Sequence, residues 1–296
     1  MFLKALSAGT SLLVKLEKDL YSQVTSSDFA SRYIPDYSWT DSTEAEFKKA
    51  DVSLKINEDS NFSFIFNQDQ GVLSYSKDNQ ISVEDIITVI DYCLEYARER
   101  NNIYCLHGSA VGLDGKGILL VGQASGLGKT TLSLNLCVDH QAKFVGDEKI
   151  LINNKLELIN GVKIVSYNKT SLFESVKVNL NNKRIGQNTQ LVQAQSAPIK
   201  IKLVVQPLIC PSAKEVEVEK WPELKANFHF YEDLSRKIRG VSRRVGKFSL
   251  PLPSLDNEIL ATKRSELANQ IASNIPFFSI KGDIAPVMNE IIRLVS

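Results

Sequence analysis

Gly117-Ile118-Leu119-Leu120-Val121-Gly122 is the most informative apolar run of this chain, because Ser125-Gly126-Leu127-Gly128-Lys129-Thr130-Thr131-Leu132 follows it after two residues. An apolar run of strand type leads into a glycine-rich loop, and a helical pattern opens where the loop ends. This order is typical of a P-loop, in which consecutive backbone N–H groups turn inward around a phosphate. The competing interpretation is an ordinary glycine-rich turn that precedes a helix.

Each part of the loop has a predicted task. The helix N-terminus behind it adds roughly half a positive charge. Lys129 would reach the terminal phosphates, and the Thr130 hydroxyl would ligate Mg²⁺. The loop departs from the pattern G-x-x-x-x-G-K-[ST], because Gln123 stands where the first glycine is expected and Gly122 lies one residue earlier. The first turn would therefore start at Gly122, or Gln123 would adopt a conformation that glycine usually supplies.

Composition limits the functional classes. The 296 residues are 43% hydrophobic and 23% charged, as is ordinary for a globular protein, and the formal net charge of +1 gives no field that favours nucleic acid or membrane. No apolar run approaches the roughly 18 residues that span a bilayer, and no secretion signal is evident. The four cysteines show no C-x-x-C spacing, which argues against a zinc site and a disulfide framework and predicts free thiols in the cytoplasm.

The first part of the chain reads as a small, mostly antiparallel unit over residues 1–85. Apolar residues alternate with polar ones over 52–56 and 62–66, and Asn67–Gly71 predicts a hairpin-type connection to a strand over 72–75. A helix is expected from Ser82, because Ser82 and Asp85 match a capping box.

The remainder, residues 86–296, reads as a larger α/β domain with α+β character. We expect strands over 104–113 and 117–121, joined by a turn at Asp114-Gly115, and a strand over 143–148 that ends in two acids. Further strands are expected over 150–152, 156–159, 175–180 and 199–205, and helices over 223–239, 254–273 and 284–294.

Three pieces then occur in order: His107-Gly108 on a strand, the P-loop, and Val145-Gly146-Asp147-Glu148 on the next strand. Over about residues 103 to 150 this order resembles the HPr kinase/phosphorylase family, which carries a His-Gly strand motif, a P-loop and a Val-Ala-Asp-Asp segment. Phosphoenolpyruvate carboxykinase shares that core. A similar branch phosphorylates the C-terminal serine of lasso-peptide precursors.

The resemblance implies a site for ATP and Mg²⁺. The loop residues 125–131 and Lys129 would hold the phosphates, with Thr130 on the metal. Asp147 matches the first acid of the family pair, which accepts the proton of the acceptor hydroxyl, and Glu148 matches the second, a metal ligand. His107 matches the histidine near the transferred phosphate. Without the resemblance, the acids would read as a polar loop start and His107 as a structural histidine.

A basic cluster spans residues 234–244, and within it Arg239, beside Gly240, is predicted to face a phosphate as a catalytic residue. The alternatives are a solvated basic face or a patch that binds an acidic peptide. Nucleic-acid binding is disfavoured, because Phe228, Phe230 and Tyr231 precede the cluster at a helical spacing that predicts core positions.

The function expected from these features is an ATP-dependent kinase that phosphorylates a serine hydroxyl of a peptide or small protein, such as an HPr-like protein or a lasso-peptide precursor. Two alternatives remain open: a kinase for a small-molecule hydroxyl, and a non-catalytic nucleotide-binding regulatory module. The expected partners exclude nucleic acid and membrane, and the resemblance also implies a homo-oligomer.

Overall fold

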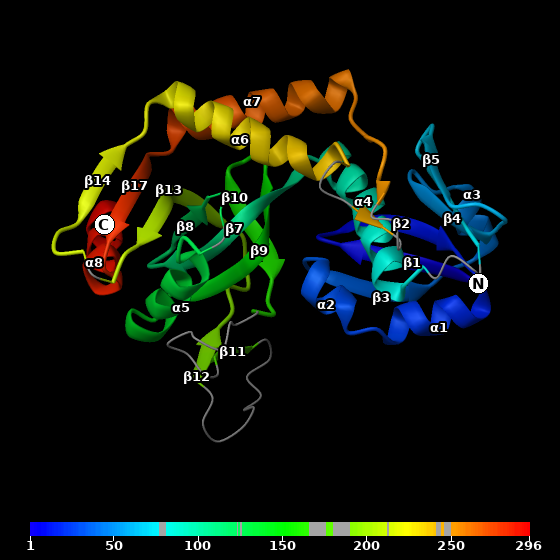
Figure 1. Cartoon of the computed structure of the whole chain (residues 1–296), viewed down its shortest axis with the longest axis horizontal. Coiled ribbons are helices and arrows are strands. Elements are labelled where there is room, and N and C mark those ends of the chain that lie inside the picture. Colours follow the sequence, from blue (N-terminus) through cyan, green and yellow to red (C-terminus); the bar gives the residue numbers. More distant parts are fainter. Residues whose placement is uncertain are drawn as a thin grey trace. The chain divides into compact units, whose positions relative to one another are not determined.

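The chain is an α/β protein whose residues fall into two compact units (Figure 1). Unit 1 comprises Met1–Tyr104 and Leu234–Lys263, and unit 2 comprises Cys105–Asp233 and Arg264–Ser296. These units do not coincide with the predicted ranges 1–85 and 86–296. The computed structural model describes residues 1–76, 81–122, 124, 126–165, 176–179, 190–211, 213–240, 244–245 and 250–296.

Unit 1 is built on a mixed sheet with the strand order β3-β1-β2-β4-β6-β5. Its β1–β2, β1–β3 and β5–β6 pairings are antiparallel, whereas β2–β4 and β4–β6 are parallel. The predicted hairpin before residue 72 is confirmed, with Gln68 and Asp69 at positive φ in the turn. The elements are β1 (Phe2–Ser7), β2 (Thr10–Lys15), α1 (Lys18–Ser26), α2 (Phe29–Tyr33), β3 (Tyr37–Asp41), α3 (Glu44–Lys48), β4 (Ser53–Glu58), β5 (Ser63–Asn67), β6 (Gln70–Tyr75), α4 (Val83–Arg100), β15 (Arg244–Val245) and β16 (Leu250–Pro251).

Helix α4 packs against β1, β2 and β4 and organises unit 1. It starts as predicted, because the Ser82 hydroxyl accepts from the backbone N–H of Asp85 and the Asp85 carboxylate accepts from that of Ser82. The returning segment 234–263 contributes Ile238, Leu252 and other residues to the same hydrophobic core. Since the core needs this distant segment, residues 1–104 form only part of the unit.

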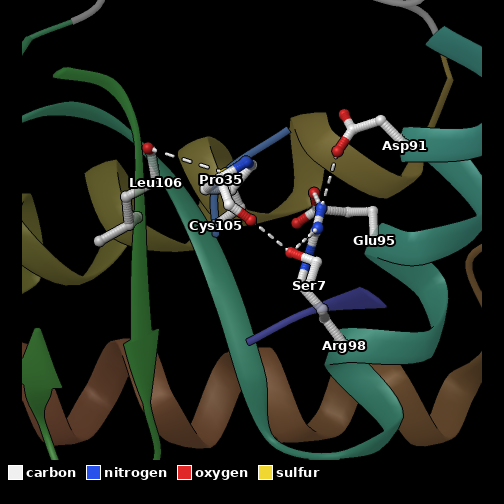
Figure 2. A network of polar contacts seen from close by, with 7 residues as sticks. All are labelled: Ser7, Pro35, Asp91, Glu95, Arg98, Cys105 and Leu106. Atoms are coloured by element: carbon white, nitrogen blue, oxygen red, sulfur yellow. Dashed lines mark hydrogen bonds and ion pairs between the residues drawn. The ribbon is translucent and has the colours of Figure 1, made fainter. Parts of the chain in front are cut away.

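A buried arginine, Arg98, lies at the centre of a polar network in unit 1 (Figure 2). Its guanidinium donates to the carboxylates of Asp91 at 3.1 Å and Glu95 at 2.6 Å, and to the Ser7 hydroxyl at 2.8 Å. Ser7 in turn donates to the carbonyl oxygen of Pro35 at 2.6 Å. These contacts pair charges that would be costly to bury alone and tie α4 to β1.

Unit 2 is built on a sheet with the order β10-β9-β7-β8-β13-β17-β14, in which an additional β10–β13 pairing closes a ring through β10, β9, β7, β8 and β13. Strands β8, β13 and β17 are parallel to one another. The predicted turn between β7 and β8 is confirmed, with Asp114 and Gly115 at positive φ. The elements are β7 (Ile103–Leu113), β8 (Lys116–Val121), α5 (Lys129–Asp139), β9 (Lys143–Asn153), β10 (Glu157–Val162), β11 (Val176–Asn179), β12 (Gln190–Gln193), β13 (Ile199–Ile209), β14 (Glu217–Lys220), β17 (Phe277–Gly282) and α8 (Ile284–Val295).

One strand prediction is wrong. The strand expected to end at its two acids continues as β9 to Asn153. Glu148 has a φ of 63°, and the pairing with β10 shifts between Gly161 and Val162, so the acids lie at an irregularity inside the strand. The apolar runs on either side of the acids belong to one strand.

The helices near the C-terminus agree with the prediction. Helix α6 covers Glu223–Ile238, α7 covers Glu258–Asn274 and α8 covers Ile284–Val295. Helices α5 and α8 share a hydrophobic core with the sheet of unit 2. In the described part of the chain no helix combines the length and the apolar character needed to cross a bilayer. All four cysteines are free thiols, as predicted.

Candidate functional site

The loop between β8 and α5 has glycines with positive φ at its start and at its end. Gly122 has a φ of 141°, and a Cβ there would lie 2.4 Å from Leu127 Cδ1, so the chain turns at Gly122. Gly128, with a φ of 91°, caps α5, and its carbonyl oxygen accepts the helical hydrogen bond from Leu132 at 2.8 Å. The first turn of α5 has no acidic residue, so its free N–H groups are available to an anion.

Lys129, the first residue of α5, folds back over this loop. Its Nζ donates to the carbonyl oxygens of Gly122 at 2.9 Å and Ala124 at 3.1 Å. Burial lowers the pKa of Lys129, and the nearby carboxylates of Glu148, Asp147 and Asp233 act in the opposite direction. The ammonium group is thus held between the loop and a group of acids.

The adjacent residue, Thr130, connects the loop to β9. Its Oγ1 donates to the Asp147 carboxylate, with distances of 2.9 Å to Oδ2 and 3.1 Å to Oδ1. Asp147 is only 3% exposed, and this burial raises the pKa of its carboxyl to about 6, although hydrogen bonds from Thr130 and Ser109 act to lower it. The first predicted acid therefore faces the start of α5.

The second acid points elsewhere. The Glu148 side chain is 66% exposed, and its Oε2 lies 3.4 Å from His107 Nδ1. Asp147, and not Glu148, is therefore the acid in contact with the Thr130 hydroxyl. His107 lies near the acid pair through its contact with Glu148.

Two further residues belong to this cluster and were missed at the sequence level. Asp233 of α6 is 4% exposed and accepts the backbone N–H of His107 at 2.8 Å. The sequence pattern that could have identified Asp233 is an acid three residues after the buried Phe230, on the apolar face of the helix. Ser109 donates to Ser133 at 2.7 Å and also forms a hydrogen bond that lowers the pKa of Asp147.

Close backbone packing explains two glycines of the motifs. A Cβ on Gly108, next to His107, would lie 2.4 Å from the carbonyl oxygen of Leu120. A Cβ on Gly146, next to Asp147, would lie 2.5 Å from the Cα of Gly161. These contacts fix the strands that carry His107 and Asp147.

The other predicted site residues lie partly in the loop, partly outside the described residues and partly in unit 1. Gly126, Leu127 and Thr131 lie in the loop and the first turn of α5, and the Leu127 carbonyl oxygen accepts the backbone N–H of Ile209 at 3.2 Å. Ser125 and Gln123 lie outside the described residues. Arg239 belongs to unit 1, where its Nε is 3.7 Å from Asp256 Oδ2, so its role at a phosphate stays a prediction.

Thr130 Oγ1 and the Asp147 carboxylate bring together oxygen atoms of the kind that Mg²⁺ prefers as ligands at nucleotide sites. Mg²⁺ in such sites uses one or two protein carboxylates besides phosphate oxygens and water. Within the described residues no group of three His, Cys, Asp or Glu side chains could hold a metal ion by itself.

No protein-family model matches the sequence, and no curated protein matches it either.

Proposed function

We propose that the protein is an ATP-dependent kinase that transfers the γ-phosphoryl group to a serine hydroxyl of a peptide or small protein. The observation that carries this proposal is the 2.9 Å contact between Thr130, which opens α5 behind the loop, and the buried carboxylate of Asp147. It supports the proposal because the loop after β8 and an acid on β9, the next strand along the chain, would then form one site, as phosphoryl transfer needs.

The loop and Lys129 would bind and orient the triphosphate. The N–H groups at the start of α5 would bind the anion, and Lys129 would exchange its contacts with the carbonyl oxygens of Gly122 and Ala124 for phosphate oxygens. Because this positive charge is already in place, little reorganisation would be needed when charge develops on the transferred group.

Asp147 would accept the proton of the acceptor hydroxyl. Its pKa of about 6 suits a general base near neutral pH, because the carboxylate is ionised yet more basic than an exposed aspartate. Thr130 would hold Mg²⁺, which neutralises phosphate charge when bound. Glu148 would orient His107 toward the phosphate through their contact.

The acceptor class rests on the resemblance to HPr kinase-like enzymes and lasso-peptide precursor kinases. The direct test incubates the protein with Mg-ATP and a library of serine-containing peptides and measures phosphopeptides by mass spectrometry. A mass increase of one phosphate on a subset of peptides is the expected result. Phosphorylation of small hydroxyl compounds alone would favour a small-molecule kinase, and ATP binding without transfer would favour a regulatory module.

Two variants test the assigned roles in the same assay. Lys129→Ala should weaken ATP binding and abolish transfer, whereas Lys55→Ala, at an exposed lysine, should change neither. Asp147→Asn should leave ATP binding intact and slow turnover by at least ~10²-fold, the lower end for a positioned base. The exposed Asp139→Asn is its matched control. Equal loss of binding and turnover in Asp147→Asn would make Asp147 a metal ligand.

A further inference from the structure

Beside the phosphate loop, unit 2 contains a pocket of about 410 Å³ that the proposed chemistry does not use. Ala124 and Leu127 of the loop form one wall. The rest comes from Gln206, near the end of β13, and from Trp221, Lys225, Phe228 and His229 in and just before α6. A ligand whose phosphates lie on the loop would therefore have this pocket within reach on one side of the loop.

Phe228 offers an exposed aromatic surface at the pocket. Its side chain is 66% exposed, although helical spacing predicted a core position, so that prediction is wrong. Trp221 is covered on its faces, since its ring stacks on Phe277 at 4.0 Å and Lys225 Nζ lies 4.1 Å from its centroid. An exposed phenyl ring at the edge of a pocket suits a flat ring that stacks on it.

A chain of hydrogen bonds fixes the orientation of the Gln206 side-chain amide, which lines the pocket. Trp221 Nε1 donates to Ser279 Oγ at 2.6 Å, and Ser279 Oγ donates to Gln206 Oε1 at 3.3 Å. Because Oε1 is engaged in this way, the amide presents the N–H groups of Nε2 as donors. The Nε2 atom lies 3.6 Å from the position that a Cβ of Gly122 would occupy, and so beside the start of the loop.

We propose that this pocket binds the purine base of the nucleotide, which stacks on Phe228 and accepts a hydrogen bond from the Gln206 amide. The inference rests on the proposed nucleotide function and adds the part of the ligand that gives base selectivity. The acids around Lys129 are Asp147, Glu148 and Asp233, and none of them lines the pocket. The base would thus occupy the apolar side of the loop, and the reacting phosphate would face the acids.

The test compares ATP with inorganic tripolyphosphate, which has the same phosphates and no base. Isothermal titration calorimetry in Mg²⁺ would measure both ligands on the full chain, on Phe228→Ala and on Leu224→Ala. Leu224 is 81% exposed, lies one turn earlier on α6 and is not in the pocket, so it is the matched control. Both substitutions are at exposed side chains, and their thermal unfolding should match that of the parent.

Phe228→Ala should weaken ATP about tenfold, since loss of one base–aromatic stack costs that order of affinity, while its affinity for tripolyphosphate stays unchanged. ATP and GTP should compete more strongly than CTP and UTP, and Leu224→Ala should behave as the parent. Unchanged ATP affinity in Phe228→Ala would overturn the base pocket and leave the phosphate loop standing. If Phe228→Ala kept its ATP affinity but had a raised KM for a peptide substrate, the pocket would bind the peptide acceptor instead of the base. If the parent bound neither ligand, the proposed function itself would fail.

Discussion

At the scale of single residues, Asp147 combines a buried position beside the start of α5 with a cost to stability. Burial raises the pKa of its carboxyl from 3.8 to about 6, so the folded chain binds a proton more tightly than the unfolded chain does. The stabilisation that comes from this tighter proton binding is fully present below pH 3.8, the pKa in the unfolded chain. It is lost as the pH rises through about 6, the pKa in the folded chain. A shift of about 2 pKa units corresponds to roughly 3 kcal/mol, so the ionised Asp147 would destabilise the fold by up to that amount at neutral pH.

We therefore expect Asp147→Asn to raise the free energy of unfolding at pH 7.5 by roughly 1 to 3 kcal/mol, because the amide carries no charge to desolvate. Urea unfolding in EDTA at pH 7.5 and pH 4 measures it, and the gain should shrink toward zero at pH 4, where Asp147 is protonated. The exposed Asp139→Asn should show no such pH-dependent gain. A gain that persisted at pH 4 would mean that burial of the charge is not its source.

At the scale of elements, α4 depends on its buried guanidinium. Arg98→Met should destabilise the fold by about 3 to 5 kcal/mol, because it removes the cation from the buried carboxylates of Asp91 and Glu95. Arg100→Met, two residues later, should cost about 1 kcal/mol or less, since both side chains of its ion pair with Asp69 are more than a third exposed. Chemical denaturation of both variants gives the comparison.

A triple variant separates charge from packing in that network. Adding Asp91→Asn and Glu95→Gln to Arg98→Met should restore part of the lost stability, since the two carboxylates then carry no charge. If the triple variant were less stable than Arg98→Met alone, the network would act mainly through hydrogen-bond geometry.

The start of α5 gives a second test at this scale. Gly128→Ala combines a φ of 91° with a Cβ that would lie 2.3 Å from the Ile209 side chain, whereas Gly115→Ala has a φ of 75° and open space. Gly115→Ala is the control and should lower the free energy of unfolding by about 1 kcal/mol through backbone strain. Gly128→Ala should lower it by about 1 to 3 kcal/mol more, because the added Cβ overpacks the site. Thermal unfolding measures stability, and ATP titration should show weaker binding only in Gly128→Ala. Equal effects of the two changes on stability would mean that the loop or the Ile209 side chain shifts to make room for the added Cβ.

The same elements show what the sequence could predict. The capping box at Ser82 located the start of α4, and Asp114-Gly115 located the turn between β7 and β8, because both signals act within a few residues. The continuation of β9 through its acids was missed, because the positive φ of Glu148 reflects its pairing with β10. The contact of Asp233 with His107 joins residues 126 positions apart, and no local pattern records such a distance.

At the scale of the whole molecule, unit 1 is discontinuous in the sequence, and this has a direct consequence for folding. Tyr92 of α4 donates to the carbonyl oxygens of Ile238 at 2.5 Å and Pro253 at 2.8 Å, and Leu252 and Leu255 complete the core around it. A fragment of residues 1–104 should therefore lack cooperative unfolding, because it exposes the apolar surface that segment 234–263 covers. Addition of a synthetic peptide of residues 234–263 should restore a cooperative transition in circular dichroism, with a midpoint that rises with peptide concentration. A peptide with Leu252 and Leu255 replaced by serine is the control and should restore little. Cooperative unfolding of residues 1–104 alone, at the stability of the full chain, would show that segment 234–263 is not required for the hydrophobic core of unit 1.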